Sequence, residues 1–178
     1  MTAKDGISDR RTDRLLLSAL DASDLSAIEA MHRNPEVMAT LGGVRSAADT
    51  EAFVRDTVRH WQEYGFGLWV IRSRDSNQFM GRGGLRHTVV AGRNEVEVAY
   101  ALMPQFWGHG FATELARESI CMGFRELRLS ELVAFTQVTN HRSRRVLEKA
   151  GFRCEREFVR LHTPHILYRI GEGPVETG

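Results

Sequence analysis

The sequence predicts one α+β domain with a mixed, mostly antiparallel sheet of about seven strands flanked by helices. Strand-like and helix-like runs follow the order strand, two helices, three strands, helix, strand, helix, two strands. The chain has 178 residues, 42% of them hydrophobic, which suits a single domain with a sizeable core. No internal repeat, low-complexity segment or linker divides it. We therefore place the domain at 10–172, with flexible tails at 1–9 and 173–178.

Charge and cysteine usage narrow the class of protein. The formal net charge is +1, so no global field draws the chain to nucleic acid or to an anionic membrane, and we expect neither as a partner. No run approaches the length of a membrane helix, and the first residues lack the apolar core of a signal peptide. Cys121 and Cys154 lie far apart, so buried, reduced thiols are expected, with a disulfide or a reactive thiol as alternatives. These features together predict a cytoplasmic protein.

The first half of the chain supplies a strand, two helices and a second strand. RLLLSAL (14–20) reads as the first strand. Asp21 suits the N-cap of a helix through LSAIEAMHRN, which Pro35 closes. A second helix, SAADTEAFVRDTVRHWQEY, stops at Gly65, a residue suited to the left-handed position after a helix. LWVIRS (68–73) follows as a strand.

The second half begins with a pair of strands and ends with another. QFMGRGGLRHTV is a strand interrupted by glycines, and EVEVAYALM alternates apolar with polar residues. After a glycine turn, apolar residues from Ala112 to Leu127 fall on one helical face. ELVAFTQV (131–138) is a strand, and Asn140 suits the cap of the helix HRSRRVLEKA, which ends at Gly151. FRCEREFVR and PHILYRI read as antiparallel neighbours.

The glycine turn in QFWGHGFATE (105–114) joins a strand to a helix. Its Gly108 and Gly110 allow a ligand to approach the backbone closely, and the N–H groups of a helix N-terminus attract anions. A connecting turn without a ligand is the structural alternative. No GK[ST] follows, and Thr113 replaces the third glycine of the dinucleotide fingerprint, so a nucleotide loop of either kind is disfavoured.

Several blocks together resemble the GNAT superfamily of acetyl-CoA-dependent N-acetyltransferases, within it the RimJ/RimL type that acts on ribosomal-protein N-termini. The resemblance covers nearly the whole chain, and its most specific blocks are EVEVAYALMPQFWGHGFATEL and TNHRSRRVLEKAGFRCE. The family's pyrophosphate signature falls on residues 107–112, where Trp107 replaces the usual Gln or Arg. The resemblance implies the GNAT acyl-CoA N-acyltransferase fold.

The resemblance also implies a set of contacts to acetyl-CoA. Backbone groups at the end of the strand before the turn would bind the pantetheine arm, and the N–H groups of the turn would bind the pyrophosphate. Asn140 would contact a pantetheine amide or only cap its helix, and the basic cluster HRSRR would meet the 3′-phosphate or lie in solvent. His109 would either touch phosphate or remain a solvated turn residue. The cofactor-binding residues so implied are Ala101, Leu102, Met103, Gly108, His109, Gly110, Phe111, Ala112, Thr113, Asn140 and Arg145.

Two residues are implied to catalyse the transfer. Glu97 resembles the general base that takes a proton from the amine. Glu95 points to the same face and is the alternative base, unless both are ordinary strand residues. Ser143 resembles the position that returns a proton to the thiolate, although it also suits a helix cap. No tyrosine is evident for that task, because Tyr100 alternates away from Glu97 and is assigned to the core.

The resemblance implies an enzyme that transfers acetyl from acetyl-CoA to a primary amine by direct attack in a ternary complex, without a metal. A protein N-terminus and a small-molecule amine are equally acceptable acceptors, and a homodimer is consistent with relatives. The acceptor pocket is assigned to Trp61, Tyr64, Phe66, Trp69, His162 and His165, with core packing as the alternative. Two other functions remain: a non-catalytic acyl-CoA sensor, and a nucleic-acid-binding module built on HRSRR.

Overall fold

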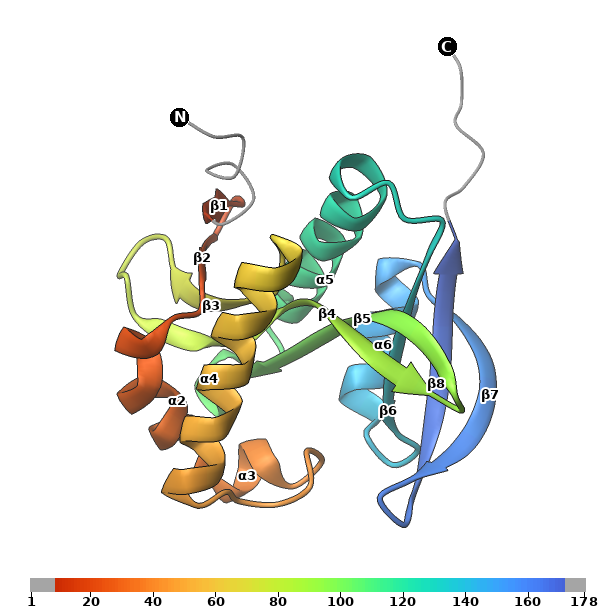
Figure 1. The fold of residues 1–178 in the computed structure, drawn as a ribbon, viewed down its shortest axis with the longest axis horizontal. Coiled ribbons are helices and arrows are strands. Elements are labelled where there is room, and N and C mark those ends of the chain that lie inside the picture. Colours follow the sequence, from red (N-terminus) through yellow and green to blue (C-terminus); the bar gives the residue numbers. More distant parts are fainter. Residues whose placement is uncertain (1–8, 172–178) are drawn as a thin grey trace.

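The computed structural model describes residues 9–171. Within that range one sheet of eight strands has the order β1-β2-β3-β4-β5-β6-β8-β7 (Figure 1). Neighbouring strands are antiparallel except β5 and β6, which are parallel. The predicted mixed, mostly antiparallel sheet is confirmed. The strands are β1 (Asp9–Arg11), β2 (Leu15–Ala19), β3 (Leu68–Ser73), β4 (Phe79–Val90), β5 (Arg93–Leu102), β6 (Glu131–Gln137), β7 (Arg153–Arg160) and β8 (Thr163–Gly171).

Helices cover both faces of this sheet. They are η1 (Ala22–Asp24), α2 (Leu25–His32), α3 (Pro35–Met38), α4 (Ala47–Tyr64), η2 (Pro104–Phe106), α5 (Phe111–Cys121), the π-helical η3 (Met122–Glu126) and α6 (His141–Ala150). On one face, Val70 of β3 packs with Ile28 of α2 and Val54 of α4. On the other, Trp69 belongs to the large core cluster that contains Leu115 of α5. No helix within residues 9–171 is long and apolar enough to cross a membrane.

The structure differs from the sequence expectation at the N-terminal end. Strand β1 was not predicted, yet it pairs with β2 and begins at Asp9, the last residue assigned to the N-terminal tail. The rest of that tail and residues 173–178 lie outside the described residues. Helix α2 ends at His32, shortly before Pro35, and Pro35 also opens the short α3, because Asn34 accepts hydrogen bonds from the N–H groups of Glu36 and Val37. Pro35 thus occupies a first-turn position where its missing N–H costs nothing.

Helix-ending glycines and the Asn140 cap were predicted correctly. Gly65 and Gly151 follow α4 and α6 with φ of +74° and +101°. Asn140 Oδ1 accepts a hydrogen bond from Ser143 N–H at 3.1 Å. Cys121 and Cys154 are both free thiols, but the expectation that they are buried was wrong, because Cys121 is half-buried and Cys154 is exposed.

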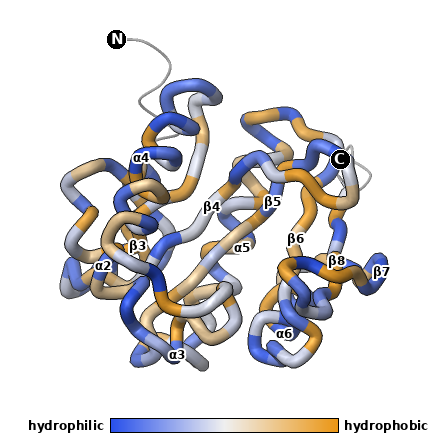
Figure 2. The backbone as a smooth tube through the Cα atoms, turned by 60° about the horizontal axis from the view of Figure 1, so that its bottom comes forward, coloured by the Kyte–Doolittle hydropathy of each residue, from blue (hydrophilic) through white to orange (hydrophobic). Residues whose placement is uncertain are grey.

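Strands β5 and β6 part soon after they meet. Their parallel ladder consists of one pair, Glu97 with Val133. Figure 2 shows the two strands diverging, with α3 near the end of β5 and α6 beside β6. The edge groups of both strands beyond Glu97 therefore lack a neighbouring strand, which is where a ligand can take part in the sheet's hydrogen bonding.

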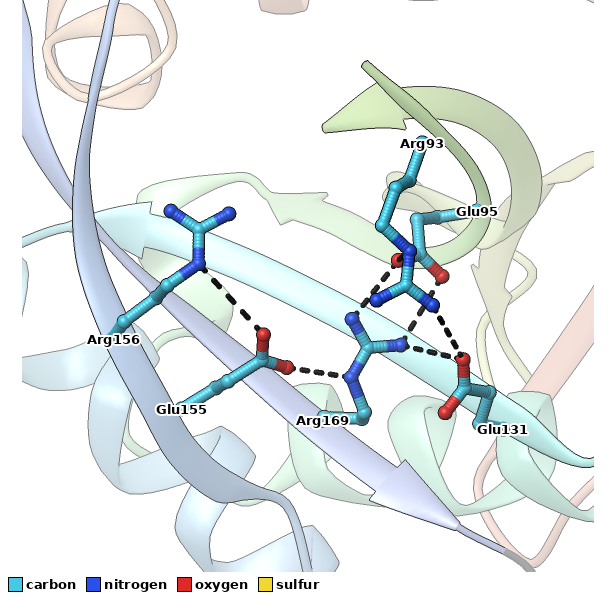
Figure 3. A network of polar contacts seen from close by, with 6 residues as sticks. All are labelled: Arg93, Glu95, Glu131, Glu155, Arg156 and Arg169. Atoms are coloured by element: carbon cyan, nitrogen blue, oxygen red, sulfur yellow. Dashed lines mark hydrogen bonds and ion pairs between the residues drawn. The ribbon is translucent and has the colours of Figure 1, made fainter. Parts of the chain in front are cut away.

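A network of ion pairs ties the strands together at the closed end of this gap (Figure 3). Arg169 of β8 donates two hydrogen bonds to Glu95 of β5, at 2.9 and 3.1 Å. The same guanidinium contacts Glu131 of β6 at 2.8 Å and Glu155 of β7 at 2.5 Å. One arginine thus links four strands beside the point where β5 and β6 separate.

Candidate active site

A cavity of about 730 Å³ lies at the gap between β5 and β6. Its walls come from the end of α3, β4, β5, the glycine turn, β6, α6 and the β7–β8 hairpin. All the predicted cofactor and catalytic residues line it except Met103 and His109. Cavities of this size suit small-molecule ligands. Segments distant in the sequence therefore meet at one site.

The glycine turn forms an open cradle at the start of α5. Gly108 and Gly110 both have φ of +82°, a conformation that side chains other than glycine rarely adopt. A Cβ on Gly108 would meet nothing within 4 Å. In residues 9–171, no protein group accepts a hydrogen bond from the N–H groups of 108–113. Several donors converging at a helix N-terminus fit the diphosphate of coenzyme A.

Two side chains brace this cradle, Trp107 from the cavity wall and Arg14 from outside the cavity. Trp107 donates its indole N–H to the carbonyl of Leu102 at 2.7 Å, which anchors the turn to the end of β5. Arg14 donates to the carbonyl of His109 at 2.9 Å and pairs with Glu114 at 2.7 Å. Trp107 thus has a structural role at the position where the pyrophosphate signature has Gln or Arg. The exposed His109 contributes its carbonyl to this bracing, and its side chain lies outside the cavity wall.

The backbone of β5 offers its ligand contacts at alternate residues. Met103 N–H donates to Met80 O at 2.8 Å, so the backbone of Met103 faces β4. Hydrogen-bonded pairs alternate along an antiparallel ladder. The backbone N–H and C=O groups of Ala101 therefore also point toward β4, whereas those of Tyr100 and Leu102 point toward the gap. This geometry favours Tyr100 and Leu102 over Ala101 and Met103 for the predicted pantetheine contacts.

Tyr100 reaches the predicted proton donor. Its hydroxyl lies 2.9 Å from Ser143 Oγ and 3.3 Å from the Ser143 carbonyl. Burial raises the pKa of the Tyr100 hydroxyl, which keeps it protonated. Tyr100 packs against the large core cluster, as predicted, but it also lines the cavity, because the strand face opposite Glu97 is also a wall of that cavity. Alternation revealed the face but not the gap beside it.

Helix α6 delivers the other polar groups on that side. Asn140 caps the helix and also donates through Nδ2 to Thr40 Oγ1 at 3.2 Å, which joins α6 to the chain after α3. Arg142 and Arg145 line the cavity, and Arg142 stacks on Trp107 at 5.0 Å from the ring centre. Arg144 instead donates to the Val138 carbonyl at 3.2 Å. The HRSRR cluster is therefore divided between the cavity and the protein surface.

The two candidate bases differ in their surroundings. Glu97 lines the cavity, is 4% exposed and accepts a hydrogen bond from Arg86 Nε at 2.9 Å. Glu95 is also buried, but Arg169 holds both of its oxygens and it does not line the cavity. Neither residue is an ordinary solvent-facing strand residue, and only Glu97 is placed to meet a substrate.

The residues assigned to the acceptor pocket lie mostly elsewhere. Of the six, only His165 lines the cavity. Trp69 is fully buried in the core, and Trp61 donates its indole N–H to the Leu68 carbonyl. The polar wall on the Glu97 side is formed instead by Arg45, Arg82 and Arg86, which the sequence analysis missed. A lone arginine in a strand gives no sequence signal of burial.

Comparison with known proteins identifies the family. A family model described as "Acetyltransferase (GNAT) domain" matches residues 14–153. The chain is 31% identical over 146 residues to the uncharacterized N-acetyltransferase YoaA of Bacillus subtilis, a match that covers 81% of this chain and 82% of YoaA. The chain therefore belongs to the GNAT acetyltransferase family and is an acyltransferase.

Solved structures share the fold. An acetyltransferase from Agrobacterium tumefaciens superposes with a TM-score of 0.82 at 24% identity, over 94% of this chain and 96% of that one. The ribosomal-protein-S5-alanine acetyltransferase of Vibrio fischeri gives 0.75 at 18% identity, over 92% and 96%. Spermidine N-acetyltransferase of Vibrio cholerae, solved with CoA and spermine, gives 0.73 at 20% identity, over 90% and 96%. The expected GNAT fold is confirmed.

Proposed function

We propose that this protein transfers an acetyl group from acetyl-CoA to a primary amine by direct attack in a ternary complex. One observation carries the proposal: the open glycine cradle, Glu97 and the Tyr100–Ser143 pair all line a single cavity where β5 and β6 part. A relative solved with CoA supports the cosubstrate. Acetyl-CoA would supply the activated acetyl thioester.

The chain's residues divide the work of binding between two elements. The N–H groups of 108–113 would hold the pyrophosphate at the N-terminus of α5, where the helix dipole adds positive potential. Tyr100 and Leu102 would bind the pantetheine arm through backbone groups that face the gap. Arg142 and Arg145 of α6 would meet the remaining phosphates. No metal is required, since each step is a proton transfer or a charge contact that these residues supply.

Proton transfer would run from one face of the sheet to the other. The new C–N bond requires the amine to lose a proton, which Glu97 would accept directly or through water. Breaking the C–S bond requires a proton at sulfur, which Ser143 would donate with Tyr100 as its partner. Glu97 and Tyr100 lie on opposite faces of β5, and Tyr100 contacts Ser143 of α6, so the proposed base and acid would approach the reacting atoms from different sides.

The first experiment is calorimetric titration of acetyl-CoA into the full chain and into Gly110→Trp. We expect micromolar binding by the parent protein and loss of binding in the variant, because a bulky residue at Gly110 would be strained at φ of +82° and its Cβ would lie 3.5 Å from Arg14, which braces the turn. Gly92→Trp is the matched control: Gly92 has a similar φ of +79°, open space around it and no place in the cavity wall. No binding by the folded parent would overturn the proposal.

Turnover, followed as free thiol released with a panel of amines, separates an enzyme from an acyl-CoA sensor. An enzyme loses turnover in Glu97→Gln and keeps its affinity for acetyl-CoA, whereas a sensor binds acetyl-CoA and acetylates none of the amines.

A nucleic-acid-binding role is disfavoured by the division of the HRSRR cluster. The narrower RimJ/RimL assignment, a homodimer and a cytoplasmic location remain predictions, to be tested with ribosomal-protein peptides, sedimentation and cell fractionation.

A further inference from the structure

The cavity has a second basic region, on the sheet face covered by α2, α3 and α4. We call it the arginine pocket and define it as Arg45, Arg82 and Arg86, which line the cavity together with Glu97. In the β4–β5 ladder Arg82 lies opposite Ala101 and Arg86 opposite Glu97. Paired residues share a face of the sheet, so both arginines lie on the Glu97 side. The arginine pocket therefore belongs to the amine end of the cavity.

Arg82 is the unusual member of this pocket. It is 4% exposed, and its Nε has no hydrogen-bond partner within residues 9–171. Its guanidinium stacks on Phe53 of α4 at 4.6 Å from the ring centre, and no carboxylate in that range forms an ion pair with it. Burial, with Arg86 and Arg45 nearby, lowers the pKa of Arg82 to about 9. A buried arginine without a counter-ion is rare unless a ligand supplies one.

The rest of the pocket does not neutralise this charge. Arg45 lies over the same Phe53 ring at 5.2 Å and also has no ion pair in the described chain. Within residues 9–171, Glu97 is the single carboxylate of this wall, and its oxygen is already bonded to Arg86; Asp49 lies near Arg45 but outside the wall. Three guanidinium groups thus face one carboxylate. A purely cationic acceptor, such as a polyamine, would be repelled by this wall.

We infer that the acceptor is a primary amine that also carries a carboxylate or phosphate group, bound by Arg82 and Arg45 while its amine lies at Glu97. This rests on the proposed acetyl transfer and names the substrate class for the same site. Guanidinium groups match both anions with paired N–H donors. The anion would give the buried Arg82 the counter-charge that the protein does not provide.

The phosphates of coenzyme A are a different source of negative charge, but other residues meet them. The glycine cradle leads into α5, which packs on the opposite face of the sheet through Leu115. Arg142 stacks on Trp107 of the glycine turn, beside that cradle. The arginine pocket would thus remain uncompensated when the cosubstrate is bound, which leaves it for the acceptor.

The test compares acceptors that differ only in the acidic group. Acetyl transfer is measured as thiol release for L-methionine against L-methioninamide, and for phosphoethanolamine against ethanolamine, with spermidine as the polycation. Peptides with Asp or Asn at the second position tell a free acidic amine from an acidic protein N-terminus. We expect at least one acid to exceed its neutral partner about 10- to 100-fold in kcat/KM, the range of a charge-assisted hydrogen bond. A preference for the neutral partners or for spermidine would overturn the inference and leave the proposed function intact.

Variants locate the preference in the pocket. Arg82→Met keeps the long apolar stem beside Phe53 and should remove most of the preference for the acid by raising its KM. Arg45→Met, a change at a half-buried loop residue, should do the same and serves if Arg82→Met fails to fold. Arg142→Met is the matched control on the other face; it should change the KM of acetyl-CoA but not the ratio of acid to neutral acceptor.

Binding of a small dianion gives a readout that does not need turnover. Malonate is titrated into the parent protein saturated with CoA, so that the cosubstrate's phosphate sites are filled, and the Tm is recorded. We expect the Tm to rise with malonate in the parent and in Arg142→Met, and to stay constant in Arg82→Met or Arg45→Met. If the parent protein binds CoA but not malonate, the inference about the acceptor is wrong and the proposed function is unaffected. A parent that does not bind CoA would remove the proposed function as well.

Discussion

The hydroxyl of Tyr100 lies 2.9 Å from Ser143 Oγ and links β5 to the first turn of α6. The pair spans the gap at which β5 and β6 separate, and both residues line the cavity. Because burial raises the pKa of Tyr100, its phenol stays protonated at neutral pH and remains a donor. This geometry is the basis for the prediction that the two hydroxyl groups hold a proton together, in addition to the packing of Tyr100 against the core.

Tyr100→Phe should therefore slow the reaction without weakening cosubstrate binding. The ring keeps its packing, while the loss of the hydroxyl removes the partner of Ser143. We expect kcat to fall about 100-fold, as for removal of a general acid, with the Kd of acetyl-CoA within about threefold of the parent value. The kcat of Ser143→Ala should fall by the same factor, and the kcat of the double variant should be no lower than that of either single variant. Independent, multiplying losses would show that the two hydroxyls do not act together.

Glu95→Gln should reduce stability and leave chemistry almost unchanged. Its two hydrogen bonds from Arg169 belong to the network that joins β5 to β8 across β6, and the side chain is largely buried. Loss of the charge should lower the free energy of unfolding by about 2 kcal/mol, measured in urea.

Glu97→Gln, the matched change two residues along the strand, should have the reverse effect. We expect a loss of about 100-fold or more in kcat and a smaller change in stability, since Arg86 is one-third exposed and can be solvated. If Glu95→Gln loses turnover while Glu97→Gln retains it, Glu95 is the base and Glu97 has the structural role.

Arg14→Met should weaken acetyl-CoA binding from outside the cavity. Arg14 holds the His109 carbonyl and Glu114, and its guanidinium covers the Phe111 ring at 4.4 Å. Without it the cradle should sample more conformations, and the Kd by calorimetry should rise about 3- to 10-fold. Because Arg14 is almost half exposed, stability should change by less than about 1 kcal/mol. Arg33→Met removes an exposed ion pair on α2 and should change neither value.

Features that depend on neighbouring residues in the chain were predictable from the sequence. The strand, turn and helix around Gly108 and Gly110 follow from the alternation of apolar and polar residues and from the glycines at the turn. The Asn140 cap follows from its residue type just before a helical run. Features set by distant partners were not. The Glu95–Arg169 pair joins positions 74 residues apart, and β1 exists because β2 offers it an edge. Arg82 is buried in a central strand and packs under Phe53, which is 29 residues away in the chain.

The pH dependence of stability offers a test of the region behind the arginine pocket. His32 is fully buried, its Nδ1 lies 3.1 Å from Thr50 Oγ1, and its Nε2 has no partner within residues 9–171. Burial, and then the nearby charges of Arg82 and Arg45, lower the pKa of His32 to about 3. The unfolded chain has a histidine pKa of about 6.5, so it binds a proton at pH values where the native protein does not.

The sign follows from this difference. Between about pH 6.5 and 3 the unfolded state holds more protons, so stability is complete above that window and is lost as the pH falls, by up to about 1.4 kcal/mol per pH unit. Urea unfolding at pH 7.5, 6, 5 and 4.5 should show a shallower slope for His32→Gln than for the parent, because carboxylates contribute equally to both. His141→Gln, at an exposed position, should keep the parent slope. Parallel curves for the parent and His32→Gln would mean that His32 titrates normally, with a charge tolerated beside Arg82.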